Sequence, residues 1–124
     1  MRNMESTYDK IQYYEFGRKE KARVVSKLKE LLDKEGKVKL ALLFGSITRR
    51  GYVRDIDVAI VTAPRLDFKE LLNLNAQVEL EMGVPTDIVE LSDLPASLKA
   101  SILKNGLLLK GTRTQQKQLL NRPS

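Results

Sequence analysis

The stretch that decides the fold is residues 38–62, VKLALLFGSITRRGYVRDIDVAIVT. It begins with a short apolar run, residues 38–44, which stops at Gly45 and Ser46. It ends with a second apolar run, residues 56–62, which is rich in β-branched residues. Short apolar runs bounded by turn residues are typical of buried β-strands. The stretch therefore predicts two buried strands with a short helix between them.

Helices and strands alternate through the rest of the chain. Apolar residues recur with helical spacing between the strand-like runs, and glycines stand where helices should end. The further predicted elements are a helix over 17–35, a helix opened by a capping-box pattern at 67–70, a strand over 86–91, a helix ending at 105–106 and a strand over 107–110. This order predicts an α+β fold, a small mixed β-sheet flanked by helices that lie mostly on one face.

Length and composition are those of one domain. The chain has 124 residues, of which 42% are hydrophobic and 31% charged, and compact domains most often have roughly 100–150 residues. We divide it into an N-terminal helical arm (1–36), a core (37–111) and a polar C-terminal tail (112–124). No apolar run approaches the ~20 residues that span a bilayer, and the N-terminus lacks a secretory signal pattern. We therefore expect a soluble, cytoplasmic protein.

Cysteine and histidine are both absent from the chain. Their absence excludes disulfides, thiolate zinc sites, cysteine nucleophiles, serine–histidine triads and imidazole bases. Acid–base or metal chemistry must therefore use carboxylates, with lysine and tyrosine as weaker candidates.

Charge changes sign along the chain, although the net charge is +6. Residues 1–54 hold fourteen Lys and Arg against seven Asp and Glu, residues 55–93 hold two against nine, and residues 94–124 hold six against none. An acidic centre between basic ends suits a site that gathers divalent cations while its surroundings attract polyphosphate or nucleic acid. For the ends, simple solvation of two terminal helices stays open as an explanation.

Three aspartates are the candidate metal ligands. Asp55 and Asp57 stand two apart at the start of a predicted strand, so their carboxylates share one face. Asp87 lies in another predicted strand and would complete a three-carboxylate cluster if the two strands were adjacent. Carboxylates suit Mg²⁺ and Mn²⁺, and such clusters hold two metal ions ~4 Å apart in phosphoryl transfer. A solvated strand end, or a turn cap or lysine partner for Asp87, would explain the same residues without metal.

Gly45 and Ser46 end the first predicted strand and precede a basic segment that contains Arg49 and Arg50. A glycine and a serine between a strand and a helix let backbone N–H groups approach an anion closely. The pattern is neither a P-loop nor a dinucleotide-binding fingerprint. An ordinary turn would also explain it.

Together these motifs resemble the signature of the DNA polymerase β-like nucleotidyltransferase superfamily. The matching features are Gly45-Ser46, eight intervening residues, Asp55-x-Asp57 and a later strand aspartate. The core of the chain is similar to the smallest members, the minimal nucleotidyltransferases. The chain departs from the family in a shorter interval before the first aspartate and in Arg54, which stands where a serine is common.

The resemblance implies a role for each matching residue. Gly45 and Ser46 would bind the triphosphate of the nucleotide. Asp55, Asp57 and Asp87 would ligate Mg²⁺ or Mn²⁺, and Asp87 would also take the proton of the acceptor hydroxyl. Phosphate would be held by Arg49, which matches by its distance from the glycine, or by Arg50, which matches by preceding Gly51.

The resemblance also implies an activity and a partner. Members of this family move a nucleoside monophosphate, here AMP from ATP, to a hydroxyl with loss of pyrophosphate. Minimal nucleotidyltransferases pair with small helical HEPN-type toxins and can adenylylate a toxin tyrosine, so we expect a Mg²⁺-dependent adenylyltransferase that acts as an antitoxin. The alternative is a non-catalytic antitoxin that neutralises its partner by complex formation. We expect no membrane partner; nucleic acid is a less favoured partner, and self-association stays open.

Four of the seven aromatic residues lie within nine positions of the N-terminal arm, at Tyr8, Tyr13, Tyr14 and Phe16. They stand outside the segment that resembles the family core. Either the arm folds back over the sheet, or it packs against a second subunit or the helical partner, because exposed apolar patches usually mark interfaces.

Overall fold

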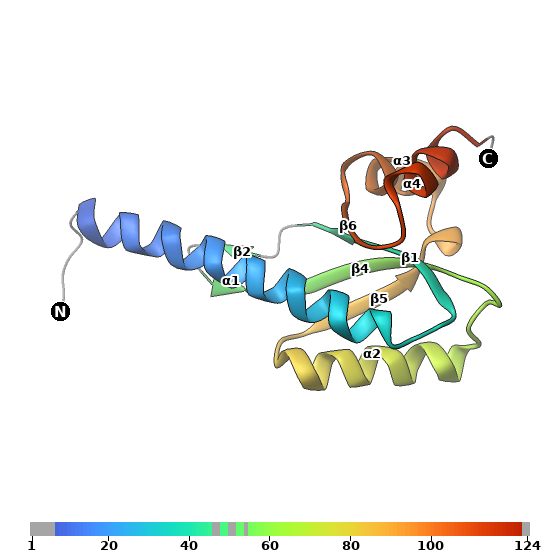
Figure 1. Cartoon of the computed structure of the whole chain (residues 1–124), viewed down its shortest axis with the longest axis horizontal. Helices are drawn as coiled ribbons and strands as arrows, with labels where there is room; N and C mark the ends of the chain where they lie inside the picture. The colour runs from blue at the N-terminus through green and yellow to red at the C-terminus, as the bar shows by residue number, and fades with distance from the viewer. Residues whose placement is uncertain (1–6, 46–47, 50–51, 54, 123–124) are drawn as a thin grey trace.

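The computed structural model describes residues 7–45, 48–49, 52–53 and 55–122, and of 7–18, 48–49 and 52–53 it describes the backbone alone. Its elements, in chain order, are α1 (Thr7–Asp33), β1 (Val38–Phe44), β2 (Thr48–Arg49), β3 (Tyr52–Val53), β4 (Ile56–Thr62), α2 (Phe68–Met82), β5 (Thr86–Glu90), the 3-10 turn η1 (Leu91–Asp93), α3 (Ala96–Asn105), β6 (Leu107–Lys110) and α4 (Arg113–Leu120). A four-stranded sheet lies between two layers of helices (Figure 1).

The sheet has the strand order β5-β4-β1-β6. β1 pairs antiparallel with β4 and β6, whereas β4 pairs parallel with β5. The predicted α+β fold with a small mixed sheet is therefore confirmed. Three predicted strands have their predicted bounds, and β5 ends one residue early because Leu91 begins the turn η1.

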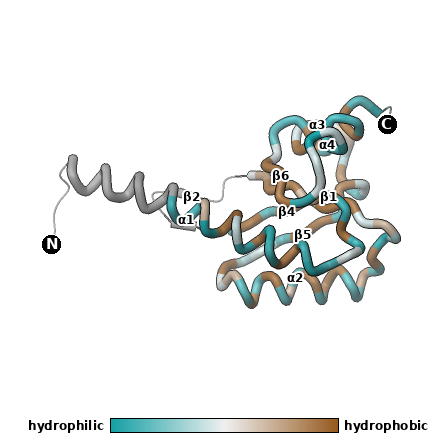
Figure 2. The backbone as a smooth tube through the Cα atoms, viewed as in Figure 1, coloured by the Kyte–Doolittle hydropathy of each residue, from teal (hydrophilic) through white to brown (hydrophobic). Residues whose placement is uncertain are grey.

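Helices cover both faces of the sheet, so the prediction that they lie mostly on one face is wrong. Ala41 and Leu43 of β1 pack in the core formed with α1 and α2, whereas Leu40 and Leu42 pack in the core formed with α3 and α4. Figure 2 shows hydrophobic residues along the strands between the two helix layers. A strand buried on both faces reads as a continuous apolar run, and such a run does not tell which helix covers which face.

The first helix is longer than predicted, because α1 begins at Thr7 and includes the aromatic segment in one continuous helix. Its first turns extend beyond the sheet (Figure 1). Tyr8, Tyr13, Tyr14 and Phe16 have side chains outside the described part of the structure, so both hypotheses for the arm stay predictions. Neither α1 nor another helix within the described ranges is long and apolar enough to cross a membrane.

The segment between β1 and β4 also differs from the prediction. Thr48–Arg49 and Tyr52–Val53 pair as short antiparallel strands, where we expected a short helix. β-branched and aromatic residues on both sides of an Arg-Gly dipeptide favour a hairpin over a helix.

A helix, α4, occupies most of the segment predicted as a polar tail. Its N-cap Thr112 forms a capping box with Gln115, and the buried Gln116 donates a 2.8 Å hydrogen bond from Nε2 to the carbonyl of Leu103. Its apolar residues are too few to give a helical pattern in the sequence. The division of the chain at residues 36 and 111 remains a prediction.

The start of α2 is fixed by the predicted capping box. The Asp67 carboxylate accepts a 2.7 Å hydrogen bond from the Glu70 N–H, and Glu70 Oε1 accepts one of 3.0 Å from the Asp67 N–H. Glu70 Oε2 also lies 2.5 Å from Lys37 Nζ, just before β1. This network joins the start of α2 to the sheet.

We expect Asp67→Ala to lower the free energy of unfolding by about 1 kcal/mol, because it removes the N-cap acceptor. Urea unfolding monitored by circular dichroism measures the loss. A matched control is Asp93→Ala, which breaks the exposed 2.6 Å ion pair with Arg65 and should cost roughly 0.5 kcal/mol or less. Equal losses in the two variants would contradict a specific role for the capping box.

Candidate active site

Two acidic residues lie side by side where β4 and β5 begin. Parallel pairing sets Asp57 opposite Asp87, and paired strands are about 4.8 Å apart. Ile56 and Val58, on either side of Asp57, both point into the core formed with α1 and α2. Because strand side chains alternate, Asp57 and its neighbour Asp87 lie on the opposite face, the one that carries α3 and α4. The adjacency on which the predicted carboxylate cluster depends is therefore present.

The position of Asp87 is fixed from α2. Asn75 Oδ1 accepts a 2.7 Å hydrogen bond from the Ile88 N–H, and Glu79 Oε1 accepts one of 3.1 Å from the Thr86 N–H. The two donors are the residues on either side of Asp87, and the two acceptors stand one helical turn apart. β5 is the edge strand of the sheet, so these bonds occupy backbone groups that no further strand reaches. Sequence reasoning missed both acceptors, because only the fold brings α2 beside β5.

The turn after β1 lies against the same acids. Phe44 pairs with Asp57 across the antiparallel ladder. Gly45 has φ +75°, and a Cβ added there would lie 3.1 Å from Asp57 Oδ2. Glycine is therefore favoured for two reasons, the left-handed backbone and the close carboxylate.

Several predicted phosphate-binding residues cannot be placed beside this turn. Ser46 and Arg50 lie outside the described residues, and for Arg49, in β2, the backbone alone is described. Their assignment to phosphate rests on the sequence pattern.

The electrostatics of the site centre on Asp57. Partial burial raises the pKa of this carboxyl, and the nearby charges of Asp55 and Asp87 raise the pKa further. Asp55 is exposed just before β4, and Asp87 is exposed at the sheet edge. Concentrated negative charge of this kind is costly without a cation, because like charges disfavour one another's ionised forms.

The donor set suits a divalent cation shared with a nucleotide. Among the described residues, no three acidic side chains converge closely enough to form a metal site by themselves. Mg²⁺, however, is commonly bound by one or two carboxylates together with substrate phosphates and water. The paired Asp57 and Asp87 fit this arrangement, with Asp55 at its margin.

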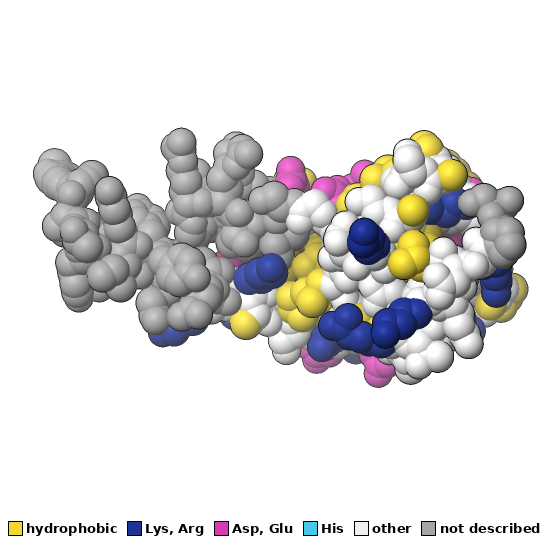
Figure 3. Space-filling model, turned by 90° about the horizontal axis from the view of Figure 1, so that it is seen from above, with side chains coloured by type: hydrophobic (Ala, Val, Ile, Leu, Met, Phe, Trp, Pro, Cys, Tyr) yellow, Lys and Arg dark blue, Asp and Glu magenta, His cyan; other side chains and the backbone are white. Residues whose placement is uncertain are grey.

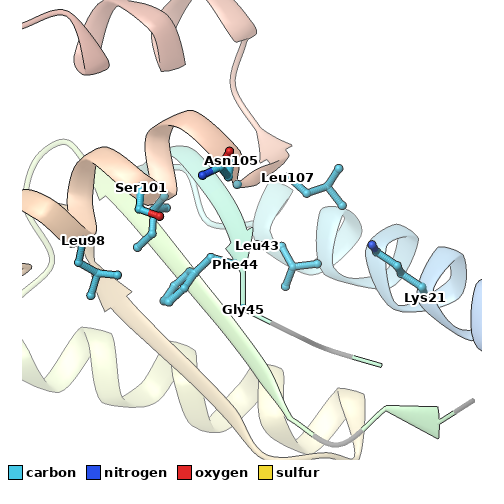
Figure 4. Close-up of a pocket in the computed structure, with 10 residues that line it drawn as sticks. Lys21, Leu43, Phe44, Gly45, Leu98, Ser101, Asn105 and Leu107 are labelled. Carbon is cyan, nitrogen blue, oxygen red and sulfur yellow. The ribbon is translucent and has the colours of Figure 1, made fainter. Parts of the chain in front are cut away.

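A cavity of about 660 Å³ begins at the end of β1 (Figure 4). It is lined by Phe44 at the end of β1, by Gly45 in the turn that follows, by Ser101 and Asn105 of α3, and by Lys21 of α1. It combines an aromatic wall, a hydroxyl, a carboxamide and a cation, and its volume is in the range of small-molecule sites. The sequence motifs gave no signal for these α1 and α3 residues, since their convergence depends on helices covering both faces.

Basic side chains surround this face of the molecule. Figure 3, which views the α3 and α4 layer, shows Lys and Arg side chains gathered on it. The exposed ones on and beside these helices are Lys104, Arg113, Lys117 and Arg122. A concentration of positive charge of this kind suits the attraction of polyphosphate to the side of the sheet that α3 and α4 cover.

Comparisons with known proteins find both a family model and solved structures that are similar to this chain. A family model described as polymerase beta, nucleotidyltransferase, matches residues 26–115. A search of curated protein sequences finds no match. Among solved structures, the chain is similar to a chain in the crystal structure of the MntA–HepT toxin–antitoxin, with 25% identity over 80% of both chains and a TM-score of 0.66.

Two further solved structures are similar to the same extent. One is a toxin–antitoxin complex with AMP-PNP, 27% identical over 77% of this chain and 80% of that chain, with a TM-score of 0.66. The other is a complex of a tri-AMPylated HEPN toxin of Shewanella oneidensis with an MNT antitoxin. Its matching chain is 25% identical over 80% of this chain and 79% of that chain, also with a TM-score of 0.66.

We expect Asp57→Asn to raise the free energy of unfolding at pH 7 without divalent cations. Because the pKa of Asp57 is raised on folding, the ionised carboxylate costs stability above that raised pKa. This cost disappears as the pH falls through the raised pKa toward the ordinary pKa that the carboxyl has in the unfolded chain. The gain of the variant should therefore shrink between pH 7 and roughly pH 4.

Urea unfolding in EDTA across this pH range measures the gain. Asp93→Asn, which changes an exposed acid away from the cluster, is the control and should show no such stabilisation. A loss of stability in Asp57→Asn at pH 7 would assign Asp57 a structural role.

Proposed function

The chain belongs to the polymerase β nucleotidyltransferase family, and from this premise we propose that it transfers AMP from ATP to a hydroxyl of a helical HEPN-type toxin and so acts as an antitoxin. The single observation that carries the proposal is the parallel register that sets Asp57 beside Asp87, next to the Gly45 turn. A nucleotidyltransferase needs carboxylates at this place relative to a phosphate-binding turn, because charge must be neutralised where the phosphates bind.

The solved relatives support the choice of nucleotide and acceptor. They include a complex with AMP-PNP and a complex whose HEPN toxin is AMPylated. This chain matches about four-fifths of the length of those relatives. Because the acceptor in the AMPylated complex lies on the HEPN toxin, we propose that a helical partner presents the acceptor hydroxyl to this chain.

The reaction would proceed by direct displacement at the α-phosphorus. The acceptor oxygen attacks that phosphorus, the bond from it to the oxygen bridging to the β-phosphate breaks, and pyrophosphate leaves. The acceptor proton passes to a carboxylate, for which we propose the exposed Asp87 at the edge of the sheet. The chain's main contribution is positioning, which can supply much of the rate enhancement.

We propose that Asp57 and Asp87, with Asp55, hold the metal. Bound there with the triphosphate, Mg²⁺ or Mn²⁺ would neutralise charge on the phosphate oxygens. Gly45 and Ser46 would donate backbone N–H groups to the same phosphates.

We further propose that Arg49 and Arg50 add charge-assisted hydrogen bonds to the triphosphate. Both belong to the basic segment that follows the Gly45 turn.

The cavity at the end of β1 is the proposed place of the nucleoside. It begins at Gly45, where the phosphates would lie, and continues between Phe44 and α3. The ring of Phe44 offers an apolar surface for a base. Ser101 and Asn105 offer donors and acceptors for its polar edge.

Transfer is tested by incubating the chain with its co-purified helical partner, Mg²⁺ and ATP labelled at the α-phosphate or at the γ-phosphate. We expect label on the partner from the α-phosphate alone, with a mass increase equal to AMP. EDTA should abolish it, and Asp57→Asn or Asp87→Asn should lower the rate at least about a hundredfold, because several kcal/mol of charge stabilisation is lost.

Asp93→Asn is the matched control, since it removes an exposed charge just beyond β5, and it should keep the wild-type rate. A partner that the chain neutralises without any gain in mass would establish the non-catalytic antitoxin instead. Full transfer by both aspartate variants would reject the assignment of the site.

The nucleoside position gives a separate prediction. Asn105→Ala should raise the KM for ATP by about threefold to tenfold, as expected for one lost hydrogen bond, and should change kcat less. Ser97→Ala, which alters another exposed polar residue of α3 but lies outside the cavity lining, is the control. An unchanged KM in both Asn105→Ala and Ser101→Ala would place the nucleoside elsewhere.

A further inference from the structure

The outer face of α2 carries a row of apolar residues that the core does not use. Phe68, Leu72, Ala76 and Leu80 follow one another at intervals of four, and Phe68, Leu72 and Leu80 are 76%, 52% and 81% exposed. The inner face of α2 is already packed through other residues, among them Leu74 and Val78. Large apolar side chains exposed in a continuous row are typical of an interface.

The apolar row is complementary to the same row of a second copy that runs in the opposite direction. In an antiparallel pair of α2 helices centred near Leu74, Phe68 of one copy meets Leu80 of the other, and Leu72 meets Ala76. Each large side chain thus meets an apolar partner, and a large residue faces a small one at the centre. We propose that this row is the interface between two copies of the chain, related by a twofold axis across α2.

The adjacent polar row has the charge pattern that such a pair requires. Lys69, Asn73, Gln77 and Glu81 run beside the apolar row, also at intervals of four, from a cation to an anion. Reversal brings Lys69 of each copy toward Glu81 of the other, at both ends of the interface. Glu81 lies 3.8 Å from Lys27 Nζ in a loose ion pair, with both side chains more than two-fifths exposed, so it remains accessible. A parallel pair would instead place the two Lys69 side chains at one end of the interface and the two Glu81 side chains at the other, so this pairing of opposite charges would be lost.

The geometry of helix packing favours the same arrangement. Rows at intervals of four are the ridges that interlock in the commonest class of helix pairs, which cross at about −50°. Since α2 covers the face opposite Asp57 and Asp87, the pair would leave both acid clusters open. Stable interfaces bury at least roughly 1,200 Å², and because a single pair of helices is a small contact, we expect the dimer to be weak and concentration-dependent.

Site-specific cross-linking tests the arrangement directly, because the chain has no cysteine. Ala76→Cys places one thiol close to the proposed twofold axis, and a short bis-maleimide should convert the protein to a covalent dimer. The matched control is Ala100→Cys, an exposed alanine on α3, which should cross-link poorly. Equal yields from the two variants would overturn the proposal.

Charge exchange tests the antiparallel register. Lys69→Glu and Glu81→Lys should each raise the dimer dissociation constant in sedimentation equilibrium, and the double variant should restore it. Leu80→Asp should weaken the dimer by about tenfold or more while keeping the melting temperature. Failure of the double variant to restore association would overturn the register.

The proposal is independent of the catalytic function, since every variant should still transfer AMP. A wild-type chain that stays monomeric at all concentrations, while Leu80→Asp loses its helical partner, would assign the face to that partner and overturn the dimer.

Discussion

The parallel pairing of β4 with β5 is the constraint on which the site depends. It sets Asp57 directly beside Asp87, and the like charges make this register unfavourable by itself. Two side chains of α2 hold the edge strand in place through the backbone N–H groups flanking Asp87. The free-energy cost of concentrating negative charge is thus offset by apolar packing beneath the strands and by hydrogen bonds along the edge of the sheet. The result is a pre-formed anionic site beside a glycine turn.

Local signals in the sequence predicted the elements well. The apolar runs of β1 and β4 have few alternatives to buried strands, and Asp67 with Glu70 specifies the start of α2 through a bond pattern within four residues. Signals that depend on distant packing were missed. α4 is stabilised by its capping box and by the buried Gln116, whose bond to Leu103 links two helices that periodicity treats separately.

In the candidate site, too, local signals were recognised in the sequence and features that depend on distant packing were missed. Asp57 and Asp87 stood out because acidic residues are unusual in apolar strands. Their adjacency, however, depends on the pairing of β4 with β5, which no local signal in the sequence specifies. The cavity residues Ser101 and Asn105 carry no motif, and they reach the end of β1 because α3 packs on that face. The roles of the acids and of Arg49 and Arg50 remain predictions.

The way α2 covers β5 also limits how the chain can recognise another protein. An open edge strand invites an incoming strand to extend the sheet, a common route to both peptide recognition and aggregation. Here the outward N–H groups of Thr86 and Ile88 already donate to Glu79 and Asn75. Strand addition at this edge would have to break both bonds. Binding beside Asp87 must therefore proceed through side chains and shape, the mode available to a helical partner, and the edge is protected from uncontrolled sheet growth.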